Sequence, residues 1–146
     1  MVTIKIKKKD NKTLLPLRAH ETDACYDVYA HSIEVIEENK VKVGLGFMTE
    51  IEEGWKGVVV PRSNLAKTDW MFGNSLGVID SSYRGEWMII FTHVRNDWKT
   101  LNFPYKIGER VGQIYFTPVH VVSFLSVEQL SETERGAGGF GSSGLK

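Results

Sequence analysis

Short apolar segments, separated by turn-forming clusters, are the feature that most limits how this chain can fold. Each segment has the length of a single strand, and no stretch carries the long periodicity of an amphipathic helix. The pattern predicts an all-β fold: a jelly-roll-like β-barrel or sandwich, with at most a short helix after Ser63. The apolar segments are Val58–Val60, Trp87–Phe91, Ile114–Phe116 and Val119–Leu125, and the clusters are Glu52–Gly54, Asn96–Asp97 and Lys106–Gly108.

Two further segments alternate between apolar and other residues, as half-buried strands do. Near the start of the chain, Ile4 and Ile6 alternate with the basic run Lys5–Lys9. Lysines on a strand discourage the addition of a further strand, so this segment is interpreted as the solvated side of an edge strand. Alternating apolar residues from Val41 to Phe47 predict another strand.

Length and charge restrict the class of protein. The chain has 146 residues, enough for one domain with a real core, and its formal net charge is zero. Neither a nucleic-acid polymer nor a membrane surface is therefore expected as a partner. The single cysteine, Cys25, excludes an intrachain disulfide, and with no secretory segment the expected location is reducing, intracellular and cytoplasmic. The four histidines lack zinc-ligand spacing.

Several polar residues interrupt or follow the apolar segments. Asp27 lies within an apolar stretch, where it is either a satisfied turn aspartate or a functional carboxylate. Arg62 and Ser63 directly follow a buried-looking strand, and such residues either hold phosphate or form an ordinary helix start with a surface arginine. Gln113 enters a strand, as an edge residue or as a ligand-binding amide.

The densest polar stretch runs from Gly73 to Glu86, and its bracketing glycines predict a hairpin. The amide of Asn74 can read the polar edge of a base, because it both donates and accepts. Asp80 follows two apolar residues, so its carboxylate is expected to be partly desolvated and to serve as a base. Tyr83 can stack on a ring. The alternative is a well-formed hairpin with a turn aspartate.

The last residues are rich in glycine and serine, as flexible tails are. Arg135 and Phe140 argue against a plain linker, which needs neither a guanidinium nor a large ring. The glycines also match the G-x-G-x-x-G pattern, but too few residues follow for the helix that a dinucleotide site requires. The tail is interpreted as a lid whose glycine amides can wrap an anion.

Taken in order, five motifs resemble those of the trimeric dUTPase family. They are ACYDVYA, PRSNLA, GNSLGVIDSSYRGE, GERVGQIYF and RGAGGFGSSG, and the resemblance covers about residues 20–144. It implies a jelly-roll-like domain over residues 1–133, a mobile arm over 134–146, and a homotrimer with active sites at the subunit interfaces. The implied reaction is hydrolysis of dUTP to dUMP and pyrophosphate, with Mg²⁺ held mainly by the substrate phosphates.

The resemblance also implies residue roles. Asp80 activates the attacking water, and Asp27 lies near the magnesium, indirectly through its waters. The remaining residues fall into two groups. For uracil and deoxyribose these are Asn74, Gly77, Val78, Ile79, Tyr83 and Phe140; for the phosphates, Arg62, Ser63, Asn64, Gln113, Arg135, Gly139, Ser142 and Ser143.

Some positions depart from the family pattern. Ser82 stands where many members carry a second acidic residue, and Asn64 replaces the usual glycine or serine. The nearest alternative is the related dCTP deaminase family, whose base chemistry uses a glutamate, for which Glu86 is the local candidate. A non-catalytic β-sandwich that binds a partner protein, and an enzyme that also regulates a partner, are further alternatives.

Overall fold

The computed structural model describes residues 2–95 and 102–139 and contains ten strands and one 3₁₀ helix within them. The predicted all-β class is confirmed. The elements are β1 (Lys5–Lys8), β2 (Tyr26–Tyr29), β3 (Ser32–Glu37), β4 (Lys40–Gly44), β5 (Phe47–Glu50), β6 (Trp55–Val60), η1 (Ser63–Lys67), β7 (Trp70–Phe72), β8 (Gly77–Ile79), β9 (Met88–His93) and β10 (Arg110–Pro118). Among the described residues, no helix is long and apolar enough to cross a membrane.

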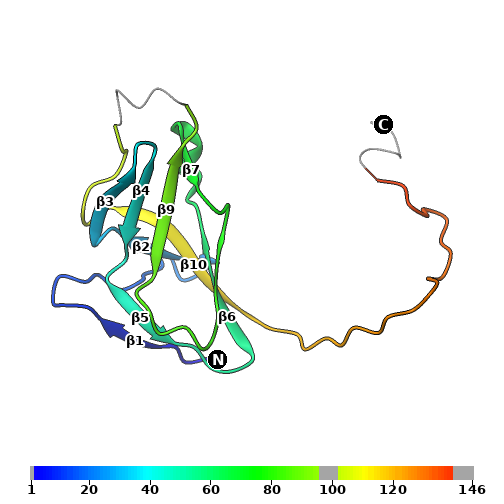
Figure 1. Ribbon diagram of the computed structural model, residues 1–146. Helices are drawn as coiled ribbons and strands as arrows, with labels where there is room; N and C mark the ends of the chain where they lie inside the picture. The colour runs from blue at the N-terminus through cyan, green and yellow to red at the C-terminus, as the bar shows by residue number, and fades with distance from the viewer. Residues whose placement is uncertain (1, 96–101, 140–146) are drawn as a thin grey trace.

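The strands form three antiparallel sheets (Figure 1). One four-stranded sheet has the order β2-β10-β6-β8, the other has the order β3-β4-β9-β7, and β1 pairs with β5. Side chains from both larger sheets share one apolar core, as in a sandwich. Its largest fully buried members are Trp87, Phe47, Phe91, Leu45 and Ile114.

The predicted edge strand at the start of the chain is confirmed, because β1 pairs with β5 alone and its four residues are exposed. The predicted helical turn after Ser63 is η1. The apolar alternation from Val41 to Phe47 is not one strand. The backbone of Gly46 has a φ of 74°, which breaks the run into β4 and β5 and turns the chain between two sheets.

A network of polar contacts fastens this corner. The carboxylate of Glu86 accepts a hydrogen bond from the backbone N–H of Gly46 at 3.0 Å and from Lys9 Nζ at 2.6 Å. The hydroxyl of Thr13, 1% exposed, donates to the carbonyl of Gly46 at 2.9 Å. The corner between β4 and β5 is therefore held by residues from two other segments, the loop after β1 and the loop before β9.

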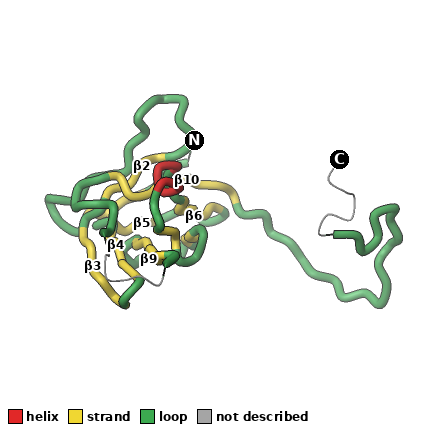
Figure 2. Tube along the Cα trace, turned by 90° about the horizontal axis from the view of Figure 1, so that it is seen from above, coloured by secondary structure: helices red, strands yellow, loops and turns green. Residues whose placement is uncertain are grey.

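The strand predicted over Val119–Leu125 is wrong. After β10 the chain leaves the sandwich and runs away from it as an extended segment without strand pairing (Figures 1 and 2). Its apolar side chains are open to solvent in the single chain: Val121 is 99% exposed and Phe124 96%. A strand needs a partner strand for its backbone groups, and within the described residues this segment pairs with no strand.

Candidate active site

Asp27 on β2 is the centre of a polar cluster at one end of the sheet β2-β10-β6-β8. Its side chain is 7% exposed and three side chains donate to it. Oδ1 accepts from Arg62 Nε and from Gln113 Nε2, both at 3.1 Å, while Oδ2 accepts from Arg110 Nη1 at 3.0 Å. Burying a carboxylate is costly unless it is paired, and two guanidiniums satisfy that requirement here. The cluster joins residues that are far apart in the sequence.

Strand register explains why these residues meet. Gln113 lies opposite both Asp27 on β2 and Val60 on β6, and Arg62 follows β6 directly. The end of β6, the middle of β10 and β2 therefore meet at one place. Of the residues predicted to form the site, Asp27, Arg62 and Gln113 are brought together.

Arg110 is a member of this cluster that the sequence reasoning missed. Side chains alternate along a regular strand, so Arg110 and Gln113, three positions apart, are expected on opposite faces. The register of β10 against β2 shifts between Arg110 and Gly112, which marks a β-bulge. The extra residue brings both side chains to the same carboxylate. The sequence signal was the motif GERVGQIYF itself, but strict alternation hides it.

Ser63 and Asn64 begin η1, directly beside the cluster. The Oδ1 of Asn64 accepts a hydrogen bond from the hydroxyl of Tyr105, at 3.5 Å. Burial raises the pKa of the Tyr105 phenol, so this hydroxyl stays a donor at neutral pH. Next to η1 lies a hollow of about 400 Å³, whose lining includes Arg62, Ser63 and Ser75.

The predicted hairpin over Gly73–Glu86 is wrong. Strand β7 pairs with β9, whereas β8 pairs with β6, so the intervening turn carries the chain from one sheet to the other. Ser75 adopts a φ of 62° in this turn. The amide nitrogen of Asn74 lies close over Gly77, where a Cβ would be 3.9 Å from it. Asn74 and the start of β8 therefore remain neighbours, as a base-reading pair requires.

Asp80 and Tyr83 lie beyond the other end of β8. Asp80 is exposed in the single chain, so the expected desolvation of its carboxylate is not observed. The reason is that β8 is the last strand of its sheet, and Val78 within it is itself 53% exposed. The hydroxyl of Tyr83 donates to the carbonyl of Glu86 at 3.1 Å. No other part of the described chain covers the side chain of Asp80.

The loop from Asp80 to Glu86 is braced by its own residues. Arg84 Nη1 donates to the carbonyl of Ser81 at 2.6 Å and to that of Tyr83 at 3.1 Å. Gly85 allows the tyrosine ring to lie against the backbone, because a Cβ there would be 2.3 Å from the Tyr83 hydroxyl oxygen. Glu86 ends the loop, and its carboxylate is occupied by Gly46 and Lys9. The deaminase alternative needs Glu86 as its catalytic glutamate, and these two contacts argue against that role.

Asp80 and the Asp27 cluster lie at opposite ends of β6, whereas Gly77 at the start of β8 pairs with Val59 and stays near the cluster. Ile79 pairs with Gly57, so Asp80 lies near Lys56, whereas Gln113 pairs with Val60 and Arg62 lies beyond it. Four residue steps separate Lys56 from Val60, about 13 Å of strand. Asp80 and the Asp27 cluster of one chain therefore do not share one site.

The tail is also separate from Asp80 and from the Asp27 cluster. Arg135 and Gly139 lie in the extended segment, where Arg135 Nε donates to the carbonyl of Gly138 at 2.9 Å. The segment contacts the sandwich through Val119, whose N–H donates to the carbonyl of Gly54 at 2.7 Å. Phe140, Ser142 and Ser143 lie outside the described residues.

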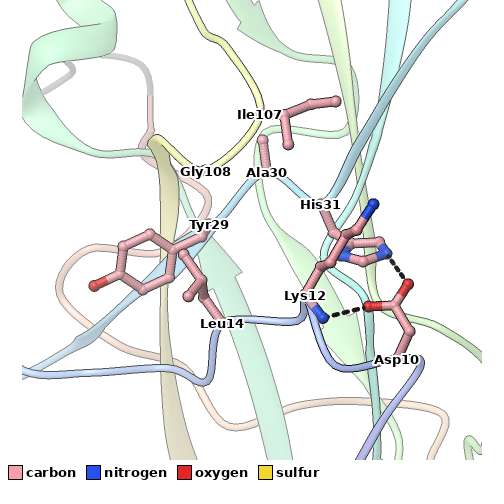
Figure 3. A pocket seen from close by; sticks show the side chains of 8 residues that line it. All are labelled: Asp10, Lys12, Leu14, Tyr29, Ala30, His31, Ile107 and Gly108. Atoms are coloured by element: carbon pink, nitrogen blue, oxygen red, sulfur yellow. Dashed lines mark hydrogen bonds and ion pairs between the residues drawn. The ribbon is translucent and has the colours of Figure 1, made fainter.

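A different pocket, of about 290 Å³, contains none of the predicted site residues (Figure 3). Its polar side is Asp10, whose Oδ2 lies 3.2 Å from His31 Nε2 and whose Oδ1 accepts from the backbone N–H of Lys12 at 2.8 Å. Tyr29 and Ile107 form its apolar side. The polar contacts fasten the loop before Thr13 to the start of β3, which is a structural role.

No group of three or more potential metal-binding side chains (His, Cys, Asp or Glu) occurs within residues 2–95 and 102–139. Asp27 is the carboxylate that Arg62 and Arg110 contact, and three donors already use its two oxygens. A carboxylate has about four lone-pair positions, so one remains for a further donor such as a water. A magnesium ion held chiefly by a ligand's own phosphates fits this arrangement better than a protein-made metal site.

The fold and these clusters define a class: an all-β, jelly-roll-like protein with an arginine-rich site suited to an anionic ligand. Comparison with known proteins makes the assignment specific. A family model described as dUTPase matches residues 11–144. The chain belongs to the dUTPase family.

Relatives and solved structures agree with this assignment. A deoxyuridine 5'-triphosphate nucleotidohydrolase of Clostridium acetobutylicum is 39% identical, over 100% of this chain and 99% of that protein. One from Nautilia profundicola is 40% identical, over 97% and 98%. The structure of the Staphylococcus bacteriophage 80alpha dUTPase with dUPNHPP has a TM-score of 0.83 at 27% identity, covering 98% of this chain and 99% of that one.

Proposed function

We propose that this chain hydrolyses dUTP to dUMP and pyrophosphate, which keeps uracil out of DNA and supplies dUMP for thymidylate synthesis. The observation that carries the proposal is the Asp27 cluster: two arginines and a glutamine converge on one buried carboxylate, in a chain of the dUTPase family. The formal charges of Asp27, Arg62 and Arg110 sum to +1, which favours the binding of an anion. Similar proteins that are named for this activity match the chain over nearly its whole length.

In this proposal Asp80 orients a water molecule and takes its proton. The resulting hydroxide attacks the α-phosphorus in line. The bond from the α-phosphorus to the oxygen that bridges to the β-phosphate breaks, and pyrophosphate leaves with the electron pair of that bond. The exposed position of Asp80 in the single chain supports this role, because a covered carboxylate has no access to substrate or water. A neighbouring subunit closing over it would supply the desolvation that strengthens a base.

Recognition of uracil and deoxyribose is assigned to residues of the turn before β8, of β8 itself, of the loop after it and of the arm. Asn74 reads the base edge together with the backbone of Gly77, Val78 and Ile79, and Phe140 stacks on the base. Tyr83 packs under the deoxyribose and leaves no room for a 2'-hydroxyl. The support is local: Asn74 lies over Gly77, and Gly85 leaves the space that the tyrosine ring needs. A missing hydrogen bond in such a pocket is costly, which favours uracil over cytosine.

Phosphate binding is assigned to the residues near the C-terminal end of β6 and to the arm. Arg62, Ser63, Asn64 and Gln113 lie together around Asp27 and η1, and the arm over residues 134–146 adds Arg135. The arm's Gly139, Ser142 and Ser143 are further proposed donors. Bound Mg²⁺ would neutralise phosphate charge and fix the shape of the triphosphate. Because side chains already contact both oxygens of Asp27, the carboxylate would accept a hydrogen bond from a water bound to that ion and would not bind the ion directly.

Assembly into a homotrimer is part of the proposal. Asp80 and the Asp27 cluster lie at opposite ends of β6 within one chain, so a complete site needs residues from more than one subunit. The extended segment after β10 supports the same conclusion, because it exposes Val121, Phe124 and Leu125 to at least 86% and pairs with no strand among the described residues. A neighbouring subunit would bury them.

The test is pyrophosphate release from dUTP, dTTP, dCTP and UTP with magnesium, for the parent chain and for Asp80→Asn. We expect release from dUTP alone and a loss of at least about 10³-fold in the variant, since a positioned base contributes about 10²–10⁴-fold. Asp69→Asn is the matched control, because Asp69 is an exposed carboxylate that pairs with Arg95 beside strands β7 and β9 of the other sheet. Ammonia release from dCTP without pyrophosphate would favour the deaminase alternative.

The assembly is tested separately by the mass of the protein in solution. Phe124→Asp places a charge on the exposed segment, and we expect it to shift the particle from three chains towards one without unfolding the sandwich. The hydrolytic activity is expected to fall with the loss of the trimer. A parent chain that is a single subunit at micromolar concentration and still hydrolyses dUTP would overturn the shared-site part of the proposal.

The proposed place of action is the reducing interior of the cell.

A further inference from the structure

The two arginines of the Asp27 cluster use the carboxylate in different ways. Arg62 donates through Nε alone, to Oδ1 at 3.1 Å. Arg110 donates through Nη1, to Oδ2 at 3.0 Å. Asp27 therefore receives one bond from each guanidinium, and neither arginine forms the two parallel bonds that an arginine and a carboxylate prefer.

This division leaves donors unused on Arg62. A guanidinium has five N–H donors, and the contact with Asp27 takes the one on Nε. Within residues 2–95 and 102–139, the terminal nitrogens of Arg62 make no hydrogen bond to protein. Its side chain is 25% exposed, so those nitrogens are partly accessible from solvent. Their donors are the ones available to bind an anion.

The β-bulge in β10 makes this arrangement possible. The register shift between Arg110 and Gly112 carries Arg110 to the Asp27 side of the strand. Gly112 lies at this shift, and a Cβ there would be 2.9 Å from Ile89 Cδ1 in the core, so that methyl group would have to move. Arg110 is 47% exposed, compared with 7% for the carboxylate that it contacts. Its position is therefore set by the strand rather than by burial.

We propose that Arg110 is a positioning residue for Arg62. By occupying Oδ2 of Asp27, Arg110 limits Arg62 to its single contact through Nε and keeps the terminal nitrogens of Arg62 directed at the substrate phosphates. Without Arg110, both oxygens of Asp27 are open to Arg62. The fork of the guanidinium then closes on the carboxylate with two parallel bonds, which withdraws it from the phosphates. Arg110 thus acts through Arg62, without touching substrate.

The inference deepens the proposed function and rests on it, so its test includes binding as well as turnover. The probe is the imido analogue of dUTP, the ligand of the phage 80alpha enzyme structure, with binding measured by calorimetry in magnesium. Arg110→Met is expected to weaken binding about 10- to 100-fold, the effect of losing one charge-assisted bond. The KM for dUTP is expected to rise similarly and kcat to change less than about threefold.

Two controls separate positioning from a loss of stability or charge. Arg95→Met removes an exposed arginine that contacts Asp69 through the same Nε atom, and it is expected to bind the analogue like the parent. Arg110→Lys keeps a cation and one donor for Oδ2, so it is expected to retain binding within about threefold. If Arg110→Met does not fold, the lysine variant carries the test, and a tenfold loss in it would overturn the proposal.

A double-mutant cycle distinguishes positioning from direct phosphate contact. If Arg110 acts only through Arg62, adding Arg110→Met to Arg62→Ala weakens binding less than about twofold further. If Arg110 itself contacts the phosphates, the two effects multiply, and the proposal is wrong.

The crystal structure of Arg110→Met without ligand gives an answer that does not depend on the reaction. We expect both oxygens of Asp27 to accept hydrogen bonds from Arg62 in that variant. An Arg62 that keeps its single Nε contact rejects the inference, whatever the parent hydrolyses. Failure of the parent to release pyrophosphate from dUTP would instead count against the proposed function, and leave this structural answer standing.

Discussion

Replacing Asp27 by asparagine tests whether the buried carboxylate holds one end of the sheet together. The substitution preserves size and one oxygen, but it removes the charge and places an amide group against donors. Asp27 accepts three hydrogen bonds, two of them from guanidiniums. Because its side chain is 7% exposed, the variant cannot replace those bonds fully with water.

The magnitude follows from the exposure of the partners. Removing one partner of a fully buried ion pair costs about 3–5 kcal/mol. Arg110 is 47% exposed and Arg62 25%, so both guanidiniums recover part of their hydration in the variant. We therefore expect a loss of about 2–3 kcal/mol. For a chain of this length that corresponds to a decrease in Tm of about 4–12 °C.

The assay is thermal unfolding of the parent and variant at equal protein concentration, since association makes Tm depend on concentration. Asp69→Asn is the matched control. Asp69 pairs with Arg95 through Nε at 3.2 Å, the same kind of contact, but the two side chains are 45% and 70% exposed. An exposed pair contributes about 0–1 kcal/mol. Equal decreases in Tm for the two variants would refute the reasoning that burial sets the strength of the Asp27 cluster.

Three further predictions concern other parts of the molecule. Gly85→Ala is expected to displace the ring of Tyr83, because the new Cβ would be 2.3 Å from its hydroxyl oxygen; the ratio of kcat/KM for dUTP over UTP should fall at least about tenfold, and an unchanged ratio would contradict the steric argument. Glu86→Gln weakens the hydrogen bond that the Gly46 N–H donates to the carboxylate at 3.0 Å, and urea unfolding should show a decrease of about 1–2 kcal/mol in the free energy of unfolding. An unchanged urea midpoint would show that this contact does not stabilise the corner between β4 and β5. Burial raises the pKa of the Cys25 thiol, so less of it is thiolate at pH 8 and alkylation by iodoacetamide should be slower in the folded protein than in urea; equal rates would disprove this.

Much of the fold was predictable because it is encoded locally. Apolar runs at Val58–Val60 and Ile114–Phe116 became strands β6 and β10, and the lysine-rich start became an edge strand. These features depend on the period of side chains along a strand, which the sequence carries directly. The predicted turn of helix after Ser63 also depends on neighbouring residues, and η1 confirms it.

Predictions failed where the outcome depends on a distant partner. The segment Val119–Leu125 has the composition of a strand, but it pairs with no other strand within the described chain. The flanks of the Gly73–Glu86 turn pair with strands of different sheets, although a hairpin was the local expectation. Pairing is a contact between segments far apart in sequence, so local pattern cannot decide it.

The sequence by itself determined the inventory of the candidate site: an aspartate, arginines, a glutamine and a glycine-rich tail, in the order of one family. Only the tertiary structure decided how they are arranged. The bulge in β10 puts Arg110 beside Gln113 on the carboxylate of Asp27, and the register of β8 on β6 carries Asp80 to the opposite end of the sheet. Residue types are local properties of the chain, whereas register and bulges arise from the packing of the whole sandwich.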